Sequence, residues 1–166
     1  MKKVIVIGCP GSGKSTFARK LAEKTGLPLH YLDMMYWNED KTTVSKDIFR
    51  ERLNVILAEE KWIIDGNYGS TLEVRMSACD TVFFLDFDVE VCLSGIKERR
   101  GNPRPDMPWI ETEEDTEFIE FIKNYNADSR PKVLELLNKY SDKSIIVFRS
   151  RNEADEFIER ISPTES

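Results

Sequence analysis

The chain has few of the residues that build metal and disulfide sites. Its 166 residues include one histidine, His30, and three cysteines, Cys9, Cys79 and Cys92, none of which belong to a CxxC pair. A structural zinc site needs four Cys or His ligands at short spacings, so this composition argues against one. Three scattered cysteines are typical of proteins from a reducing compartment.

Long hydrophobic runs are also missing. The first apolar run, residues 4–7, is shorter than the hydrophobic region of a signal peptide, and no stretch approaches the length that spans a membrane. We therefore expect a cytoplasmic protein.

A net charge of −6 without a long basic run argues against nucleic acid as the main partner. The length and the absence of repeats predict one domain over residues 1–166.

Strand-like and helix-like patterns alternate along the chain. Short apolar runs predict strands at residues 4–7, 27–32, 62–64, 81–85 and 145–148. Apolar residues at helical spacing predict helices at residues 16–24, 45–57, 89–100, 112–125, 133–140 and 152–161. Residues 162–166 are expected to form a frayed tail. This alternation predicts an α/β fold, a three-layer sandwich around a five-stranded parallel sheet.

A glycine-rich turn follows the first predicted strand and opens the first predicted helix. Its pattern, Gly, four residues, then Gly-Lys-Ser, predicts a P-loop, whose backbone N–H groups cradle phosphate oxygens. Lys14 would contact the β- and γ-phosphates, and the Ser15 hydroxyl would bind the accompanying Mg²⁺. The alternative is a turn that binds nothing. The expected nucleotide-binding residues are Gly8, Cys9, Pro10, Gly11, Ser12, Gly13, Lys14, Ser15 and Thr16.

Aspartates follow the second and third predicted strands. If both strands flank the first, Asp33 and Asp65 face the P-loop from one edge of the sheet. One carboxylate could then accept a proton from an attacking hydroxyl, and the other could hold Mg²⁺ through water. The alternative is that each aspartate merely caps a loop. Asp86, after the fourth strand, is a third candidate.

The densest basic cluster lies beside a loop rich in proline and glycine. Arg100 and Arg104 bracket residues 101–103, and a closing loop that carries arginine can neutralise charge on a transferring phosphoryl group. The alternative is a solvated helix end, where basic residues suit the helix dipole. Arg130 could join the cluster from the next helix. His30 is more often a packed residue than a catalyst in such a position, although it lies close to Asp33.

The order of these parts resembles the adenylate-kinase-like branch of P-loop kinases, small enzymes that phosphorylate nucleoside monophosphates, shikimate or gluconate. The residues that carry the resemblance are Gly8 to Ser15, the segment around Ser45 to Ala58, Asp65-Gly66, and Arg99 to Arg104. Residues His30, Asp33, Trp37, Asp65-Gly66-Asn67-Tyr68, Arg75 and Arg104-Pro105-Asp106-Met107 also resemble the bacterial DNA topology modulation proteins, the FlaR-related group.

The resemblance implies a kinase that uses ATP and Mg²⁺. Lys14, Asp33, Asp65, Arg100 and Arg104 would be catalytic, and Ser15 and Asp65 would hold the metal. A substrate-side segment at about 33–60 and a lid at about 99–115 are implied, and the substrate would contact His30, Asp33, Trp37, Asn67, Tyr68, Arg75 and Arg130. The acceptor would be a small molecule, for example a nucleotide or nucleoside. The alternative function is a nucleotide-responsive regulator of DNA topology that acts through DNA or a protein partner.

Overall fold

The computed structural model describes residues 1–110 and 115–161. In these ranges five strands form one parallel sheet in the order β2-β3-β1-β4-β5. The strands are β1 (Lys3–Gly8), β2 (Leu29–Tyr31), β3 (Trp62–Asp65), β4 (Thr81–Leu85) and β5 (Ser144–Phe148). Parallel strands end at the same edge of a sheet, and β1, β3 and β4 deliver the P-loop, Asp65 and Asp86 there.

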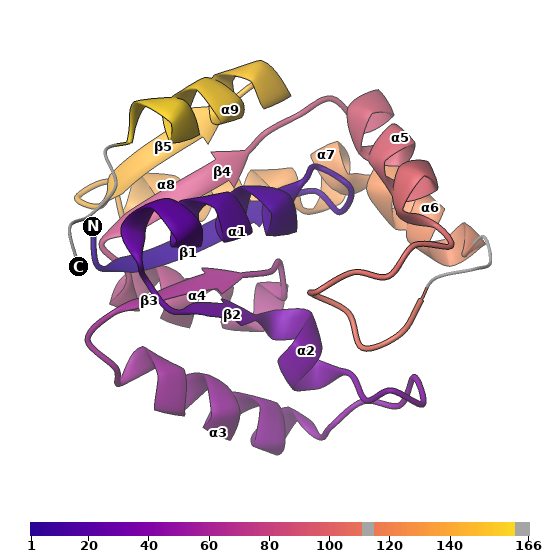
Figure 1. Cartoon of the computed structure of the whole chain (residues 1–166), viewed down its shortest axis with the longest axis horizontal. Helices are drawn as coiled ribbons and strands as arrows, with labels where there is room; N and C mark the ends of the chain where they lie inside the picture. The colour runs from indigo at the N-terminus through magenta and orange to yellow at the C-terminus, as the bar shows by residue number, and fades with distance from the viewer. Residues whose placement is uncertain (111–114, 162–166) are drawn as a thin grey trace.

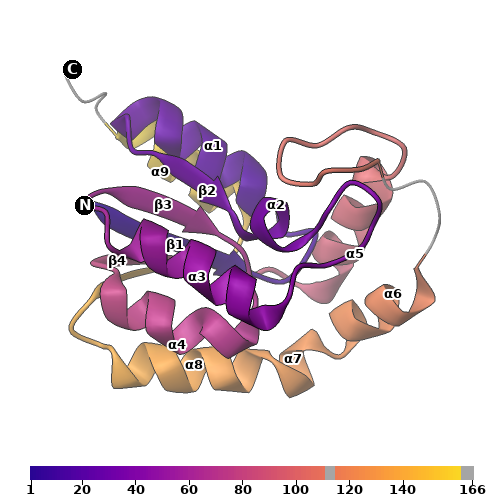
Figure 2. The ribbon, with the colours of Figure 1, turned by 90° about the horizontal axis from the view of Figure 1, so that it is seen from below.

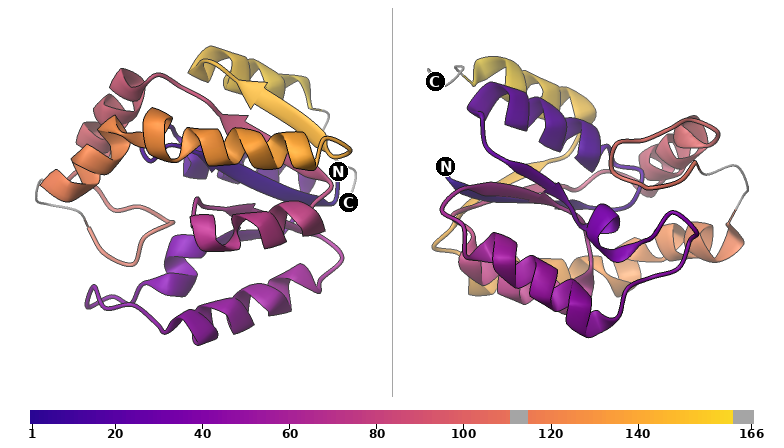
Figure 3. Two further views of the ribbon diagram at one scale, coloured as in Figure 1. Left: turned by 180° about the vertical axis from the view of Figure 1, so that it is seen from behind. Right: turned by 60° about the horizontal axis from the view of Figure 1, so that its bottom comes forward.

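Helices connect the strands and cover both faces of the sheet, as Figure 1 and the two views of Figure 3 show. Their bounds are α1 (Lys14–Thr25), α2 (Leu32–Tyr36), α3 (Lys46–Leu57), α4 (Gly69–Ala78), α5 (Val89–Arg99), α6 (Thr116–Lys123), α7 (Tyr125–Asp128), α8 (Arg130–Lys139) and α9 (Arg151–Arg160). The predicted α/β sandwich is thereby confirmed.

Each face of the sheet has its own apolar core, because successive residues of a strand point to opposite faces. Val4 and Val6 of β1 pack with α1, α5 and α9, whereas Ile5 and Ile7 pack with α3, α4 and α8. All four side chains are buried, so β1 is apolar throughout, as expected of a central parallel strand. This rigid strand fixes the position of the P-loop at its end.

Several helix ends follow the expected capping chemistry. The Ser45 hydroxyl accepts a hydrogen bond from the Ile48 N–H, 3.2 Å away, and so caps α3 at the predicted start of that helix. The last helix, predicted to start at residue 152, begins at Arg151 after Ser150, whose hydroxyl accepts from the Glu153 N–H at 3.2 Å. The predicted helix start at residues 112–114 and the predicted tail at 162–166 lie outside the described residues.

Two other expectations differ from the structure. The second strand does not flank the first, since β3 lies between β2 and β1. The sequence also gave no signal for α4, which the structure places between β3 and β4. Its buried positions include Thr71 and Arg75, so an apolar stripe is incomplete. Among the residues that the structure covers, no helix has both the length and the apolar character to cross a membrane.

Candidate active site

A large cavity lies at the carboxyl edge of the sheet. Its volume is about 2120 Å³, above the 300–1,000 Å³ usual for one small-molecule pocket. The P-loop and α1 line one side, and α2 with the start of α4 lines another. Most residues of the loop after α5, residues 101–109, also line the cavity, and Figure 2 shows this loop beside α2. The cavity therefore has room for two small molecules.

The P-loop has the backbone shape of an anion cradle. Gly13 adopts φ 96° as the cap of α1, a left-handed conformation that favours glycine, and no side chain caps the helix. At Gly11, a Cβ atom would lie 2.0 Å from the Cys92 carbonyl oxygen, so the loop can pack against α5 only with glycine there. The first-turn N–H groups of α1 therefore face the cavity, where the positive end of the helix dipole favours an anion.

Two polar side chains of the P-loop have little to bind within the protein. The Lys14 ammonium lies 3.4 Å from the Cys9 carbonyl oxygen, a long hydrogen bond. The buried Ser12 hydroxyl has no hydrogen-bond partner among the described residues. Buried polar groups without partners are rare in folded proteins and often mark the place of a ligand or ion. These groups fit phosphate oxygens.

Asp65, at the end of β3, is 5% exposed and lines the cavity. Its Oδ1 atom has no hydrogen-bond partner in the described part of the chain. Burial raises the pKa of this carboxyl from 3.8 to about 7; Lys14 opposes the rise, and the negative charges of Asp106 and Asp33 add to it. Asp65 is thus a carboxylate poised to change charge near neutral pH.

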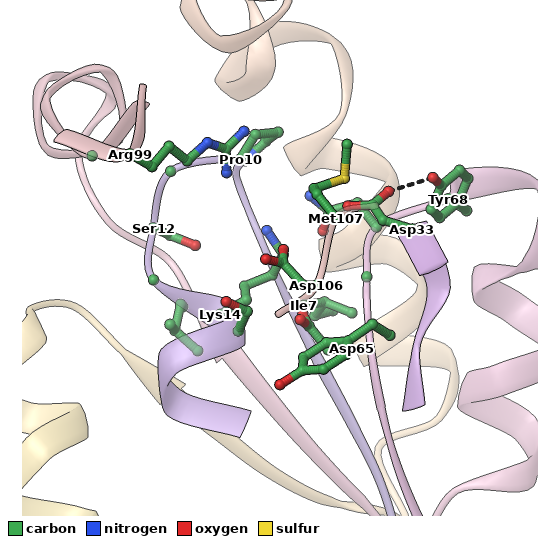
Figure 4. Close-up of a pocket in the computed structure, with 18 of the residues that line it drawn as sticks. Ile7, Pro10, Ser12, Lys14, Asp33, Asp65, Tyr68, Arg99, Asp106 and Met107 are labelled. Carbon is green, nitrogen blue, oxygen red and sulfur yellow. Dashed lines mark hydrogen bonds between the residues drawn. The ribbon is translucent and has the colours of Figure 1, made fainter. Parts of the chain in front are cut away.

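Asp33 lies in the first turn of α2 and reaches the same cavity, although β2 is not next to β1. Its Oδ1 atom accepts a hydrogen bond from the Tyr68 hydroxyl (Figure 4). Burial raises the pKa of the Asp33 carboxyl, and the Tyr68 hydrogen bond and Lys14 oppose that rise. The Tyr68 ring packs against Tyr36 and Phe49 at centroid distances of 5.1 and 5.2 Å, which fixes the hydroxyl that orients Asp33.

Asn67 connects the two strands that carry the site. Its Oδ1 atom accepts a hydrogen bond of 3.1 Å from the Gly8 N–H, so the segment after β3 is tied to the start of the P-loop. Asn67 also lines the cavity. The observed contact holds the P-loop in place, a different task from the substrate contact predicted for this residue.

The loop after α5 brings an ion pair into the cavity. Arg104 binds Asp106 with two hydrogen bonds, from Nε to Oδ1 at 3.0 Å and from Nη2 to Oδ2 at 2.8 Å. Figure 4 shows Asp106 near Lys14 and Asp65, with Met107 close to Asp33. Nothing in the sequence pattern marked Asp106 as a cavity residue, because its proline-rich surroundings predict only a surface loop.

Two arginines of the predicted lid were expected in the cavity, Arg100 and Arg104. The structure places Arg99 there with Arg104, one residue before the predicted Arg100. Arg99 lines the cavity near Pro10, whereas Arg100 follows the last turn of α5 and is absent from the lining. Successive helix residues point about 100° apart, so one position decides which side chain enters. The Arg99 guanidinium also lies 5.7 Å from the centroid of the Phe118 ring.

Two tryptophans join the loop to the opposite wall. The rings of Trp37 and Trp109 meet edge to face, with their centroids 5.0 Å apart, and both residues line the cavity. Trp37 follows α2 and Trp109 belongs to the loop after α5. This contact closes the loop against the side of the cavity that holds Asp33.

The structure does not bring three predicted substrate residues to the cavity. His30 lies on β2 with its Nε2 atom 3.8 Å from a Glu59 carboxylate oxygen, outside the lining. Arg130 binds Asp86 through two hydrogen bonds of 3.0 and 2.9 Å, also outside the lining. Asp86, the third candidate carboxylate, is therefore half of an ion pair.

Arg75 is the third. It is fully buried in α4 and donates hydrogen bonds of 3.0 to 3.1 Å to the Thr71 hydroxyl and to the carbonyl oxygens of Gly66 and Tyr68. Burial lowers the pKa of its guanidinium to about 10. The sequence suggested an anion-binding arginine here, but the side chain braces the backbone beneath Asp65 and Tyr68.

A magnesium ion would have few protein ligands in this cavity. In residues 1–110 and 115–161, no group of three or more His, Cys, Asp or Glu side chains is arranged to hold a metal ion. This fits Mg²⁺, which keeps several waters and is usually bound by one or two protein groups together with substrate phosphates. Ser15, in the first turn of α1, and Asp65, on the strand next to β1, both line the cavity and are suited to that arrangement.

Comparison with known proteins gives the fold. No protein-family model matches the chain, and no curated protein does. Shikimate kinase from Acinetobacter baumannii in complex with shikimate superposes with a TM-score of 0.65 at 17% identity, over 97% of this chain and 90% of that one. An unliganded sugar kinase from Janibacter sp. HTCC2649 gives a TM-score of 0.53 at 19% identity, over 98% and 96% of the two chains.

A second shikimate kinase, from Bacteroides thetaiotaomicron, gives a TM-score of 0.53 at 19% identity, over 95% of this chain and 94% of that one. Identities this low establish the architecture without the substrate. None of the three descriptions mentions DNA topology, so the resemblance to the DNA topology modulation group remains a prediction. The chain has the fold of a P-loop kinase.

Proposed function

We propose that this protein is an ATP-dependent kinase that transfers the γ-phosphoryl group of Mg-ATP to a hydroxyl of a small acceptor. One observation carries the proposal. A P-loop with a loosely bound lysine, and with a buried serine that has no partner among the described residues, shares one cavity with the buried carboxylate of Asp65 and the half-buried carboxylate of Asp33. Phosphoryl transfer needs a phosphate cradle, a proton acceptor and charge neutralisation at the same place.

The P-loop side of the cavity would bind the nucleotide. Backbone N–H groups of the loop and of the first turn of α1 would hold the phosphates, and Lys14 would contact the β- and γ-phosphates. Ser15, and Asp65 through water, would hold Mg²⁺, which when bound offsets the negative charge of the phosphates. Thr16 lies at the exposed start of α1 and would contact the nucleotide from that side.

Asp33 would accept the proton from the acceptor hydroxyl. The new bond forms between the acceptor oxygen and the γ-phosphorus while the bond from that phosphorus to the oxygen of the leaving ADP breaks. A carboxyl whose pKa is raised by burial is a better base than an exposed one, and the Tyr68 hydroxyl holds it in a fixed orientation. Trp37 and Tyr68 would contact the acceptor beside it.

Arg104, with Arg99 in place of Arg100, would neutralise charge on the transferring group. Arginine suits this task because its planar fork binds two phosphate oxygens.

We also propose that residues 1–166 form one domain, with a substrate-side segment at 33–60 and a lid at 99–115. The contact between Trp37 and Trp109 supports a lid that closes on that segment.

Release of ADP from Mg-ATP, measured with a panel of nucleosides, nucleoside monophosphates, sugars and hydroxy acids, tests the proposal. One acceptor is expected to stimulate release. In Asp33→Asn the stimulated rate should fall at least 100-fold while ATP still binds. Asp40→Asn, a change at an exposed residue outside the cavity lining, is the control. Stimulated release that survives in Asp33→Asn would contradict the role given to this carboxylate.

A further inference from the structure

We infer that the acceptor of this kinase is a hydroxyl compound without a negative charge, unlike a nucleoside monophosphate or a sugar acid. The inference rests on the proposed kinase function and concerns the half of the cavity formed by α2, the start of α4 and the loop at residues 101–109. Below, this part is called the acceptor half.

The arginine best placed in sequence to bind an anionic acceptor is unable to do so. Arg75 is fully buried, and it donates hydrogen bonds to the Thr71 hydroxyl and to the carbonyl oxygens of Gly66 and Tyr68. Turning it into the cavity would break all three hydrogen bonds and remove the donor that Arg75 supplies to the partly buried Gly66 carbonyl oxygen, which is unfavourable. The structure therefore uses this guanidinium to support the backbone.

Three other arginines bind elsewhere and do not line the cavity. Arg130 binds Asp86, and a second arginine, Arg149, lies 3.1 Å from the same carboxylate. Arg52, on α3 of the substrate-side segment, donates a hydrogen bond of 2.8 Å to the Met35 carbonyl oxygen.

The acceptor half instead presents carboxylates. Asp33, Asp65 and Asp106 all line the cavity, and the Oδ1 atom of the buried Asp65 has no hydrogen-bond partner within the part of the chain that the structure describes. Such an oxygen needs a donor, which a substrate hydroxyl or a metal-bound water can supply. A second phosphate or a carboxylate placed here would meet like charges at short range in a poorly solvated site, which is unfavourable.

Two cations lie against this carboxylate cluster, Lys14 and Arg104. Lys14 belongs to the P-loop, where the phosphates of ATP would take up its charge, and Arg104 is already paired with Asp106 inside its own loop. Two further lysines line the cavity, Lys41 after α2 and Lys132 on α8, but both are exposed. Water and salt screen exposed charges, so these lysines contribute little to holding an anion.

Matched pairs of compounds that differ by one anionic group test the inference. Suitable pairs are adenosine and AMP, cytidine and CMP, glucose and gluconate, and methyl shikimate and shikimate. For each, ADP release from Mg-ATP gives kcat/KM. We expect the uncharged member of at least one pair to stimulate release, with a kcat/KM at least ten-fold above its anionic partner. An equal or greater value for an anionic member, or a panel in which no uncharged member stimulates release, overturns the inference.

An added positive charge should change this preference. Met107→Lys places a cation on a half-buried, cavity-lining residue that Figure 4 shows close to Asp33, and should raise kcat/KM for the anionic member of the responding pair by at least three-fold. Met34→Lys is the control, because Met34 is exposed on α2 and is not in the lining. An equal gain in kcat/KM in the two variants, or no gain in either, contradicts the inference that negative charge in the acceptor half disfavours anionic acceptors.

The outcome also separates this inference from the proposed function. Stimulated release that depends on Lys14 but prefers an anionic acceptor leaves the kinase proposal in place and removes the inference alone. ATP that does not bind, or release that is independent of Lys14, removes the kinase proposal itself.

Discussion

Arg104 and Asp106 form a two-point ion pair inside the cavity, with hydrogen bonds of 3.0 and 2.8 Å and side chains that are each 11% exposed. The two residues are separated only by Pro105, so one short segment carries both charges. Asp106 also acts on Asp65 across the cavity, where its charge helps to raise the pKa of that carboxyl. In this state, a carboxylate lies near the place proposed for the ATP phosphates.

Asp106→Asn should therefore strengthen ATP binding. The substitution keeps the shape of the side chain but removes a negative charge near Lys14, and it weakens the competition for Arg104. We expect the Kd for ATP to fall about five-fold, which corresponds to about 1 kcal/mol. Isothermal titration calorimetry measures it, with Asp142→Asn, an exposed change far from the cavity lining, as control. Weaker ATP binding by Asp106→Asn would mean that the carboxylate positions Arg104 for the nucleotide.

Arg75→Met should destabilise the fold. The variant removes three hydrogen bonds of a fully buried side chain, among them the one that Arg75 donates to the Gly66 carbonyl oxygen, so we expect the free energy of unfolding to fall by about 3 kcal/mol. Urea denaturation measures the loss. Arg52→Met removes one exposed hydrogen bond and should cost less than about 1 kcal/mol. Equal losses in the two variants would contradict the structural role of Arg75.

Asp65 should make stability depend on pH. Its pKa is about 7 in the folded protein and 3.8 ordinarily, so between these values the folded state holds a proton that the unfolded state has lost. The free energy of unfolding therefore falls as pH rises through this window, by about 2 kcal/mol between pH 5 and pH 7 from this group. Below about pH 3, one unit under the ordinary pKa of 3.8, both states are protonated, and this contribution no longer changes.

The Asp65→Asn variant isolates that contribution, because an amide does not titrate. Relative to the original protein, the variant should gain stability steadily from pH 5 to pH 7 and should show no further gain above about pH 8. Urea denaturation at four pH values gives the two curves. Parallel curves over this range would show that burial does not raise the pKa of Asp65.

Local sequence patterns were enough to predict the P-loop and the sheet strands around it. A buried strand, a glycine-rich turn and a helix follow one another within residues 3–25, and neighbouring residues determine their conformation. The central strand β4 begins and ends at the predicted residues 81 and 85. Asp33 and Asp65 line one cavity, as expected, although the strand before Asp33 does not lie next to β1 as the prediction assumed.

Long-range placement could not be predicted from the same patterns. Asp33 reaches the cavity through the short helix α2, since β2 lies at the sheet edge beyond β3. Arg75 was predicted to contact the substrate, and its burial could not be predicted because α4 has a buried arginine and threonine where an apolar stripe is expected. Which of Arg99 and Arg100 enters the cavity depends on the rotation of α5 at its last turn. Asp106 lies in the cavity because of how its loop packs, and the sequence of that loop has no periodic pattern.

The most direct test of the account is ADP release and ATP binding by Lys14→Ala. Lys61→Ala, an exposed change outside the cavity lining, is the matched control. The account predicts that Lys14→Ala retains the circular dichroism spectrum of the original protein but loses acceptor-stimulated ADP release by at least 100-fold, while Lys61→Ala keeps it. Unchanged phosphoryl transfer by a folded Lys14→Ala variant would contradict the proposal that this P-loop binds the reacting nucleotide.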